Sequence, residues 1–186
     1  TVGELFVFQR TPNWCAPLHN SPITKEQQRK IKASYADIFK QCNETFGAFL
    51  HKMDSRSALE VSTEERTAFF EKLYAAPGFG IWLGNYRDTM TDSAANDLLS
   101  EFIAEKIRER VKDPIVAEKL IPKNHGFGTR RVPMETHYYE VYNQDNVTLG
   151  DINESPIERI TPSGIKTGKG EYALDMIVYA TGFDAV

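Results

Sequence analysis

The sequence predicts an α/β fold in which strands near both ends of the chain enclose a block of helices. An apolar run, Leu5–Phe8, stands near the start, and a second one, Glu171–Ala180, stands near the end. Between about residues 24 and 121, apolar side chains recur at the spacing of amphipathic helices. After Pro122 the pattern changes to short strand-like runs separated by glycine turns.

The first strand is predicted to be short and buried. Leu5–Phe8 is rich in Phe and Val and is bounded by polar residues, which is typical of an internal strand. Thr11-Pro12-Asn13 ends it. Because proline disfavours the helical conformation of the residue before it, Pro17 and Pro22 then keep the chain extended.

The helical block is predicted to begin at a capping box. Thr24 caps the first turn and Gln27 reaches back to it, and the helix is expected to run to about Gly47. Ser62–Glu65 repeats the capping pattern and starts a second helix. The apolar stripe of the first helix consists of Ile31, Tyr35, Ile38, Phe39, Cys42, Phe46 and Phe49.

Two further helices complete the block. Asp113-Pro114 starts the last one, because aspartate is a good cap and proline suits the first helical position, where its missing N–H is not needed. The helix before it carries an apolar stripe made of Leu98, Leu99, Phe102, Ile103, Ile107 and Val111.

Strands return in the last third of the chain. Val147–Leu149 is one, and Ile157–Ile160 and Gly164–Thr167 form a pair joined by a turn. Glu171–Ala180 is predicted as a long final strand whose apolar second half is typical of a buried parallel strand. This order of elements favours part of a Rossmann-type nucleotide-binding domain, interrupted by a mostly α-helical subdomain.

Composition and charge exclude several functional classes. The 186 residues, 41% hydrophobic and 26% charged, are ordinary for a globular protein, and a net charge of −4 argues against a nucleic-acid surface. No apolar run approaches the ~20 residues that a membrane span needs. Cys15 and Cys42 are far apart, so we expect free thiols in the cytoplasm. The four histidines lack metal-ligand spacing, so no metal site is predicted.

Arg10 stands where a nucleotide-binding domain recognises the adenosine ribose. In such domains the second strand ends beside this ribose, and an arginine there accommodates the 2′-phosphate of NADP. A guanidinium can bind phosphate through two parallel donors, and the neighbouring Gln9 and Thr11 add polar groups. On local sequence alone, an ordinary surface arginine is the favoured interpretation.

Two further segments carry candidate residues. Arg130 and Arg131 are adjacent in a glycine-containing loop, and in an extended chain neighbouring side chains point to opposite sides, so the pair can serve two different places. Thr181 and Gly182 follow the final apolar run, where a glycine lets the backbone approach a cofactor closely.

Three segments, in this order and spacing, resemble Baeyer–Villiger monooxygenases. They are Phe8–Trp14, Gly126–Arg131 and Leu174–Ala185. These enzymes use FAD, NADPH and O2 to convert ketones into esters or lactones. The resemblance covers nearly the whole chain and implies the same cofactors, a small-molecule ketone as substrate, and the same reaction.

The resemblance also implies roles for single residues. Arg130 would help to hold the NADP phosphate, and Arg131 would reach the flavin and be catalytic. Many members of the family have lysine at the first of these positions, so Arg130 departs from the pattern but keeps its charge. The other implied cofactor-binding residues are Gln9, Arg10, Thr11, Thr181 and Gly182.

The resemblance implies that the chain is an internal segment. No GxGxxG loop and no FxGxxxHxxxW signature occur in it, so we expect the flanking segments that carry them to be missing. The expected parts are a strand of an NADP-binding domain (1–17), a helical insert (18–122), and a return to that domain with a link toward an FAD domain (123–186). Two alternatives stay open: a segment of another flavin or NAD(P)H oxidoreductase, and a non-catalytic helical interaction module.

Overall fold

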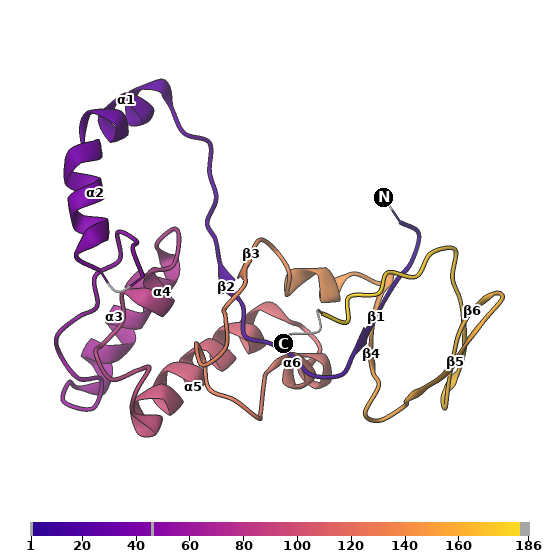
Figure 1. Cartoon of the computed structure of the whole chain (residues 1–186). Helices are drawn as coiled ribbons and strands as arrows, with labels where there is room; N and C mark the ends of the chain where they lie inside the picture. Colours follow the sequence, from indigo (N-terminus) through magenta and orange to yellow (C-terminus); the bar gives the residue numbers. More distant parts are fainter. Residues whose placement is uncertain (1, 46, 183–186) are drawn as a thin grey trace. The chain divides into compact units, whose positions relative to one another are not determined.

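The computed structural model describes residues 2–45 and 47–182, which form a mixed α/β structure (Figure 1). The chain divides into two compact units. The first unit contains the residues up to Thr11 together with those from Asp145 onward, and the second contains Pro12–Gln144. Within the described ranges, no helix is both long enough and apolar enough to cross a membrane.

The first unit consists of strands. β1 (Leu5–Gln9) and β4 (Val147–Asp151) pair in parallel over five residues each, so the two predicted strands are confirmed (Figure 1). A separate antiparallel sheet follows in the order β5, β6, β7. Its strands are β5 (Ile157–Thr161), β6 (Gly164–Thr167) and β7 (Gly170–Ala173).

Aromatic side chains hold these two sheets together. Phe6 and Phe8 both stand on β1, and each meets the ring of Tyr172 on β7 edge to face at 5.2 Å between centroids. Such edge-to-face pairs add ~0.5–1.5 kcal/mol to the burial of their surface. The short aromatic strand at the start of the chain is therefore part of the core of this unit.

The predicted long final strand is wrong. β7 ends at Ala173, it pairs antiparallel with β6, and residues 174–182 adopt no regular structure. Met176 and Val178 are 78% and 77% exposed. A strand needs a hydrogen-bonded neighbour, and no strand among the described residues pairs with this run. Phe183, Asp184 and Ala185 lie outside the described residues.

The second unit is mainly helical, and its elements were largely predicted. Side-chain caps at Thr24, Ser62 and Asp113 are present, Thr24 as a complete capping box with Gln27. The helices are α1 (Lys25–Ala33), α2 (Tyr35–Asn43), α3 (Thr63–Ala75), α4 (Gly80–Leu83), α5 (Ser93–Arg110) and α6 (Pro114–Leu120). Shorter elements are β2 (Ala16–Pro17), β3 (Met134–Glu135) and the 3-10 helix η1 (Glu140–Asn143).

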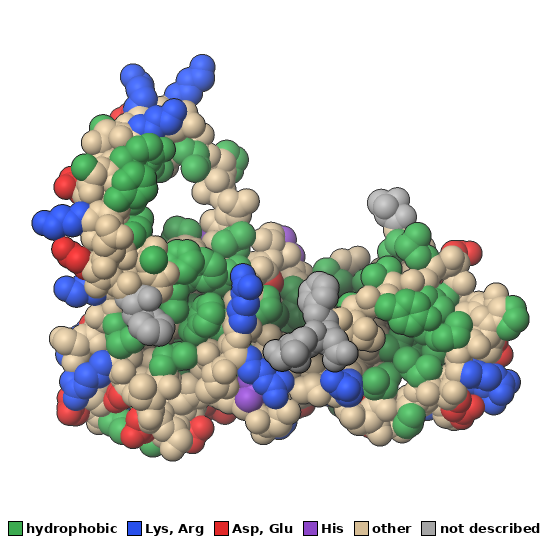
Figure 2. Space-filling view, viewed as in Figure 1, with side chains coloured by type: hydrophobic (Ala, Val, Ile, Leu, Met, Phe, Trp, Pro, Cys, Tyr) green, Lys and Arg blue, Asp and Glu red, His purple; other side chains and the backbone are tan. Residues whose placement is uncertain are grey.

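The prediction of one long first helix is also wrong. Ser34 separates α1 from α2, because its hydroxyl and its N–H both bond back to the carbonyls of Lys30 and Ile31. The apolar stripe is not buried, and Figure 2 shows hydrophobic side chains at the surface of these helices. Phe39, for example, is 61% exposed. Phe46 lies outside the described residues.

Helix α5 is the centre of the helical core. Leu99, Ile103 and Ile107 of its apolar stripe are fully buried, as the spacing predicted. Phe70 of α3 packs against Phe102 at 5.4 Å between ring centroids. Because α5 is rigid and buried along this face, residues bonded to it have a fixed position.

Candidate functional site

The residues after β1 have a fixed backbone and exposed side chains. Arg10 and Thr11 are exposed, and the N–H of Ile152 donates to the carbonyl of Gln9 at 3.0 Å. The side-chain amide of Asn153 donates to the carbonyl of Arg10. In the described part of the chain, no carboxylate pairs with the Arg10 guanidinium. Its donors are therefore available to an anion.

Gly126–Arg131, called here the basic loop, is anchored at Phe127. The Phe127 side chain is completely buried. Its N–H donates to Oγ of Ser100 at 2.9 Å, and its carbonyl accepts from Nδ2 of Asn96 at 2.8 Å. Both polar groups of this residue are thus satisfied by side chains of α5.

The two glycines of the basic loop are required for different reasons. A Cβ on Gly126 would stand 1.8 Å from Oδ1 of Asn96, so no side chain fits between the loop and α5. Gly128 has a φ of +80°, in the left-handed region that favours glycine. A Cβ there would also lie 2.8 Å from the sulfur of Met90.

The last residue of the basic loop and the residue just before the loop are hydrogen-bonded to the segment that follows β1. Nδ2 of Asn13 donates to the carbonyl of Arg131 at 3.1 Å, and Nε1 of Trp14 donates to the carbonyl of His125 at 2.9 Å. Oδ1 of the Asn13 side chain stands 3.1 Å from Nε2 of His125. Burial lowers the pKa of His125, and the charge of Arg130 lowers it further. A neutral imidazole is therefore favoured beside the arginines.

Arg130 and Arg131 themselves are exposed at the surface. Val132, the next residue, is buried and fixes the loop on its far side. Within residues 2–45 and 47–182, neither guanidinium forms an ion pair. Two unpaired arginines on an anchored backbone can bind phosphate or stabilise a negative charge that develops nearby.

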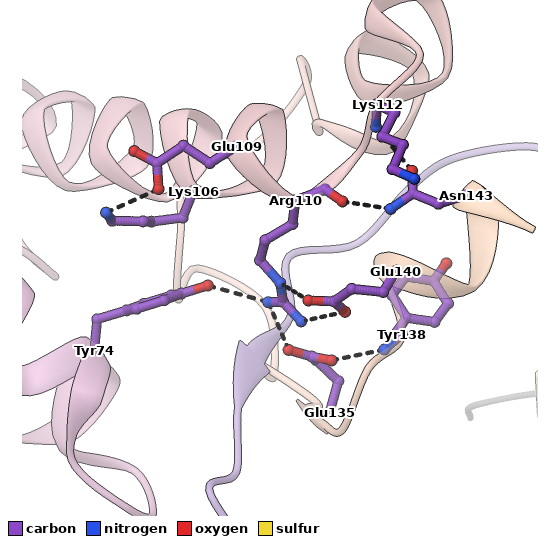
Figure 3. A network of polar contacts seen from close by, with 9 residues as sticks. All are labelled: Tyr74, Lys106, Glu109, Arg110, Lys112, Glu135, Tyr138, Glu140 and Asn143. Atoms are coloured by element: carbon purple, nitrogen blue, oxygen red, sulfur yellow. Dashed lines mark hydrogen bonds and ion pairs between the residues drawn. The ribbon is translucent and has the colours of Figure 1, made fainter.

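A partly buried ion network holds the chain that follows the basic loop (Figure 3). The Arg110 guanidinium, at the end of α5, binds both oxygens of Glu140 at 2.6 and 2.8 Å and Oε1 of Glu135 at 2.8 Å. It also donates to the hydroxyl of Tyr74 at 3.1 Å. Oε2 of Glu135 accepts from the N–H of Tyr138 at 2.8 Å. This network fixes β3 and η1 against α3 and α5.

Sequence patterns did not indicate this network, because its members stand 25 to 36 residues from Arg110 along the chain. Burial opposes the charge of Arg110, but the hydrogen bonds that it donates to Glu140 and Glu135 outweigh this effect and raise the pKa of Arg110. The same contact with Arg110 lowers the pKa of Glu140. Arg110 and Glu140 are thus both charged at neutral pH.

Cys15 lies beside this network and is not a reactive thiol. Burial raises its pKa to about 11, and the nearby charge of Glu135 acts in the same direction. The thiolate is the nucleophilic form of cysteine, so the side chain is unreactive at neutral pH. Both cysteines are free, as expected.

Thr181 and Gly182 are the last described residues. Both are exposed, and a Cβ on Gly182 would meet nothing within 4 Å, so the backbone there is open. They belong to the first unit together with Gln9, Arg10 and Thr11, whereas Arg130 and Arg131 belong to the second. In the part of the chain that is described, no hydrogen bond or ion pair joins Thr181 or Gly182 to Arg10 or Thr11.

No protein-family model matches the chain, but single proteins match it along its length. It is 56% identical to the 2-oxo-Δ3-4,5,5-trimethylcyclopentenylacetyl-CoA monooxygenase of Pseudomonas putida over 100% of the chain. It is 44% identical to the cyclopentanone 1,2-monooxygenase of a Comamonas species and 41% identical to a Baeyer–Villiger monooxygenase of Pseudooceanicola batsensis, over 98% of the chain in both cases. The chain spans 34% of the length of each.

A solved structure matches equally well. The crystal structure of OTEMO in complex with FAD and NADP superimposes with a TM-score of 0.97 at 56% identity. The match covers 100% of this chain and 34% of that one. The close homologues of this chain are therefore Baeyer–Villiger monooxygenases, and it corresponds to about a third of their length.

Proposed function

We propose that this chain is a segment of a flavin-dependent monooxygenase that uses NADPH and O2 to insert oxygen next to a ketone carbonyl, giving an ester or lactone. The observation that carries the proposal is the 56% identity over 100% of the chain to a monooxygenase of this kind. A structure that contains both FAD and NADP superimposes on the same residues. The relatives favour this function over another flavin oxidoreductase or a non-catalytic helical module.

The proposed architecture is part of a Rossmann-type NADP-binding domain with a helical insert. The parallel pair of β1 and β4 supports it, because parallel pairing of strands far apart in sequence is typical of such domains. Residues 1–17 would give one strand of this domain, and 18–122 would be the insert. Residues 123–186 would return to the domain and lead toward an FAD domain.

NADP fits the residues that follow β1. Arg10 follows the end of a parallel strand, where a ribose 2′-phosphate is bound in nucleotide-binding domains, and its guanidinium forms no ion pair within the described residues. The hydroxyl of Thr11 and the amide of Gln9 stand beside it in sequence. Arg130 would add a second positive charge from the basic loop. Thr181 and Gly182 would let the backbone approach a cofactor closely.

Arg131 is the proposed catalytic residue. FAD, when bound, would pass electrons from NADPH to O2 and so activate the oxygen that is inserted. Arg131 would stabilise the negative charge that develops on the ketone oxygen, since a guanidinium stays charged at any working pH. Its backbone carbonyl accepts a hydrogen bond from Nδ2 of Asn13, which fixes the point from which the side chain extends.

A chimera tests this proposal. In it, this chain replaces the matching segment of the Pseudomonas putida relative, which covers the chain completely. We expect a yellow protein that binds FAD, oxidises NADPH in the presence of ketones, and forms esters or lactones. The unaltered relative is the control. A folded, flavin-containing chimera that forms no such product from any ketone accepted by the relative would refute the proposed function.

A further inference from the structure

The two backbone polar groups of Phe127, its N–H and its carbonyl, are both hydrogen-bonded to helix α5. Residues 126–131 belong to no helix or strand, so no ladder of hydrogen bonds supports them. Instead, the N–H and the carbonyl of Phe127 both bond to side chains of α5. The basic loop therefore takes its position from a rigid, buried helix.

The two side chains that do this form one continuous unit. Asn96 and Ser100 are four residues apart and face the same side of α5. Ser100 Oγ donates to Oδ1 of Asn96 at 3.1 Å and accepts from the Phe127 N–H. Nδ2 of Asn96 divides its two donors between Phe127 and the carbonyl of Thr89, at 2.8 and 2.7 Å.

Burial makes this arrangement strict. Asn96 is 7% exposed, and a buried amide that loses its partners keeps the full cost of its desolvation. Any shift of the loop would break the contacts to Phe127. The absence of a side chain at Gly126 leaves room for Oδ1 of Asn96, so the glycine in the loop and the asparagine in the helix depend on each other.

We propose that Asn96 and Ser100 are positioning residues for Arg130 and Arg131. They fix the backbone of Phe127, which precedes Arg130 by three residues and Arg131 by four. In this way they determine the point on the protein surface from which each arginine side chain extends. The proposal rests on the proposed function in one respect only, namely that the arginines act on NADP and the ketone. A charged donor is effective in catalysis only when it is held in place before the reaction begins.

Ser100 offers a matched series of variants in the chimera described above. Ser100→Ala removes the acceptor of the Phe127 N–H, Ser100→Thr keeps a hydroxyl, and Ser93→Ala changes an exposed serine on the same helix. Asn96→Asp is a second variant, which keeps the shape but puts a carboxylate against two carbonyl oxygens. Flavin content and thermal midpoint show whether each variant has folded.

Hydrogen exchange measures the anchoring directly. In Ser100→Ala we expect peptides that span Phe127 to exchange about tenfold faster, as the loss of one buried hydrogen bond allows. Trypsin should also cleave after Arg130 and Arg131 sooner. Ser100→Thr and Ser93→Ala should behave like the unmodified chimera. Equal exchange in Ser100→Ala and Ser93→Ala would overturn the inference and leave the proposed function untouched.

Steady-state kinetics then tests the consequence for the arginines. We expect Ser100→Ala to raise the KM for NADPH and to lower the share of consumed NADPH that appears as ester, with flavin content unchanged. Ser100→Thr should restore both. If exchange is faster but both quantities stay unchanged, the loop does not position the arginines and the inference fails. If the unmodified chimera forms no ester, the proposed function fails, and the exchange data alone decide the anchoring.

Discussion

Replacing Arg110 by methionine should be far more harmful than replacing its near neighbour Arg108 in the same way. Both arginines stand in the last turn of α5 and both bind several glutamates. The Arg108 partners are 46–65% exposed, whereas the Glu135 side chain bound by Arg110 is only 5% exposed. The two substitutions therefore compare an arginine that has a buried carboxylate partner with one whose partners are all exposed.

The expected magnitudes follow from this difference. Removing one partner of a buried pair leaves an uncompensated charge and costs about 3–5 kcal/mol, whereas an exposed pair is worth about 0–1 kcal/mol. Arg110→Met also loses the bonds to Glu140 and Tyr74 and the stacking over Tyr139, whose ring centroid lies 5.0 Å from the guanidinium carbon. A loss of this size is a large part of the ~5–15 kcal/mol that stabilises a typical domain.

Urea unfolding of the chain, followed by far-ultraviolet circular dichroism, measures both free energies. Arg110→Met combined with Glu135→Leu should recover much of the lost stability, because no unpaired charge then remains buried. The reasoning is refuted if Arg108→Met and Arg110→Met cost the same, or if the double variant is less stable than Arg110→Met alone.

Three further predictions concern single side chains. In the chimera, Arg10→Ala should weaken NADPH binding about ten- to a hundredfold and NADH binding much less, because a charge-assisted bond is worth roughly 1.5–3 kcal/mol; equal losses for both would exclude the 2′-phosphate contact. Arg131→Ala should lower ester formation by ~10²–10³ while NADPH still reduces the flavin, as stopped-flow spectra beside product analysis will show. The Arg110 contact lowers the pKa of Glu140, so this carboxylate stabilises the fold above its unfolded-state pKa of ~4.3, and that stability is lost as pH falls through the lower folded-state pKa. Glu140→Gln should remove this part of the acid dependence of the urea midpoint, and identical pH profiles for both proteins would contradict it.

The sequence predicted best where the signal is local. The caps at Thr24, Ser62 and Asp113 lie within a few residues of the groups they bind, so their patterns were visible without tertiary structure. The break at Ser34 is also local, but a serine inside a helical pattern more often continues the helix than ends it. The prediction of one long helix failed there for that reason.

Predictions failed where a residue depends on a distant partner. The apolar run Glu171–Ala180 has the composition of a buried strand, but composition does not supply a neighbouring strand, and β7 ends at Ala173. The network around Arg110 joins four elements that no spacing rule connects. Of the candidate site residues, the sequence indicated which ones carry the charge. It did not indicate which side chains hold the backbone beside them in place.

The basic loop shows what the structure adds to a correctly chosen motif. In the sequence, Gly126-Phe127-Gly128 is a turn signal that precedes two arginines. In the structure, Gly126 makes room for Asn96, Phe127 fills the core beside Trp14, and Gly128 adopts a positive φ. The structure thus gives a separate reason for the residue type at each of these three positions of the loop. These contacts fix the backbone from which the two exposed arginine side chains extend, and neither guanidinium forms an ion pair within the described residues. A backbone that is ordered in advance lowers the cost of binding an anion.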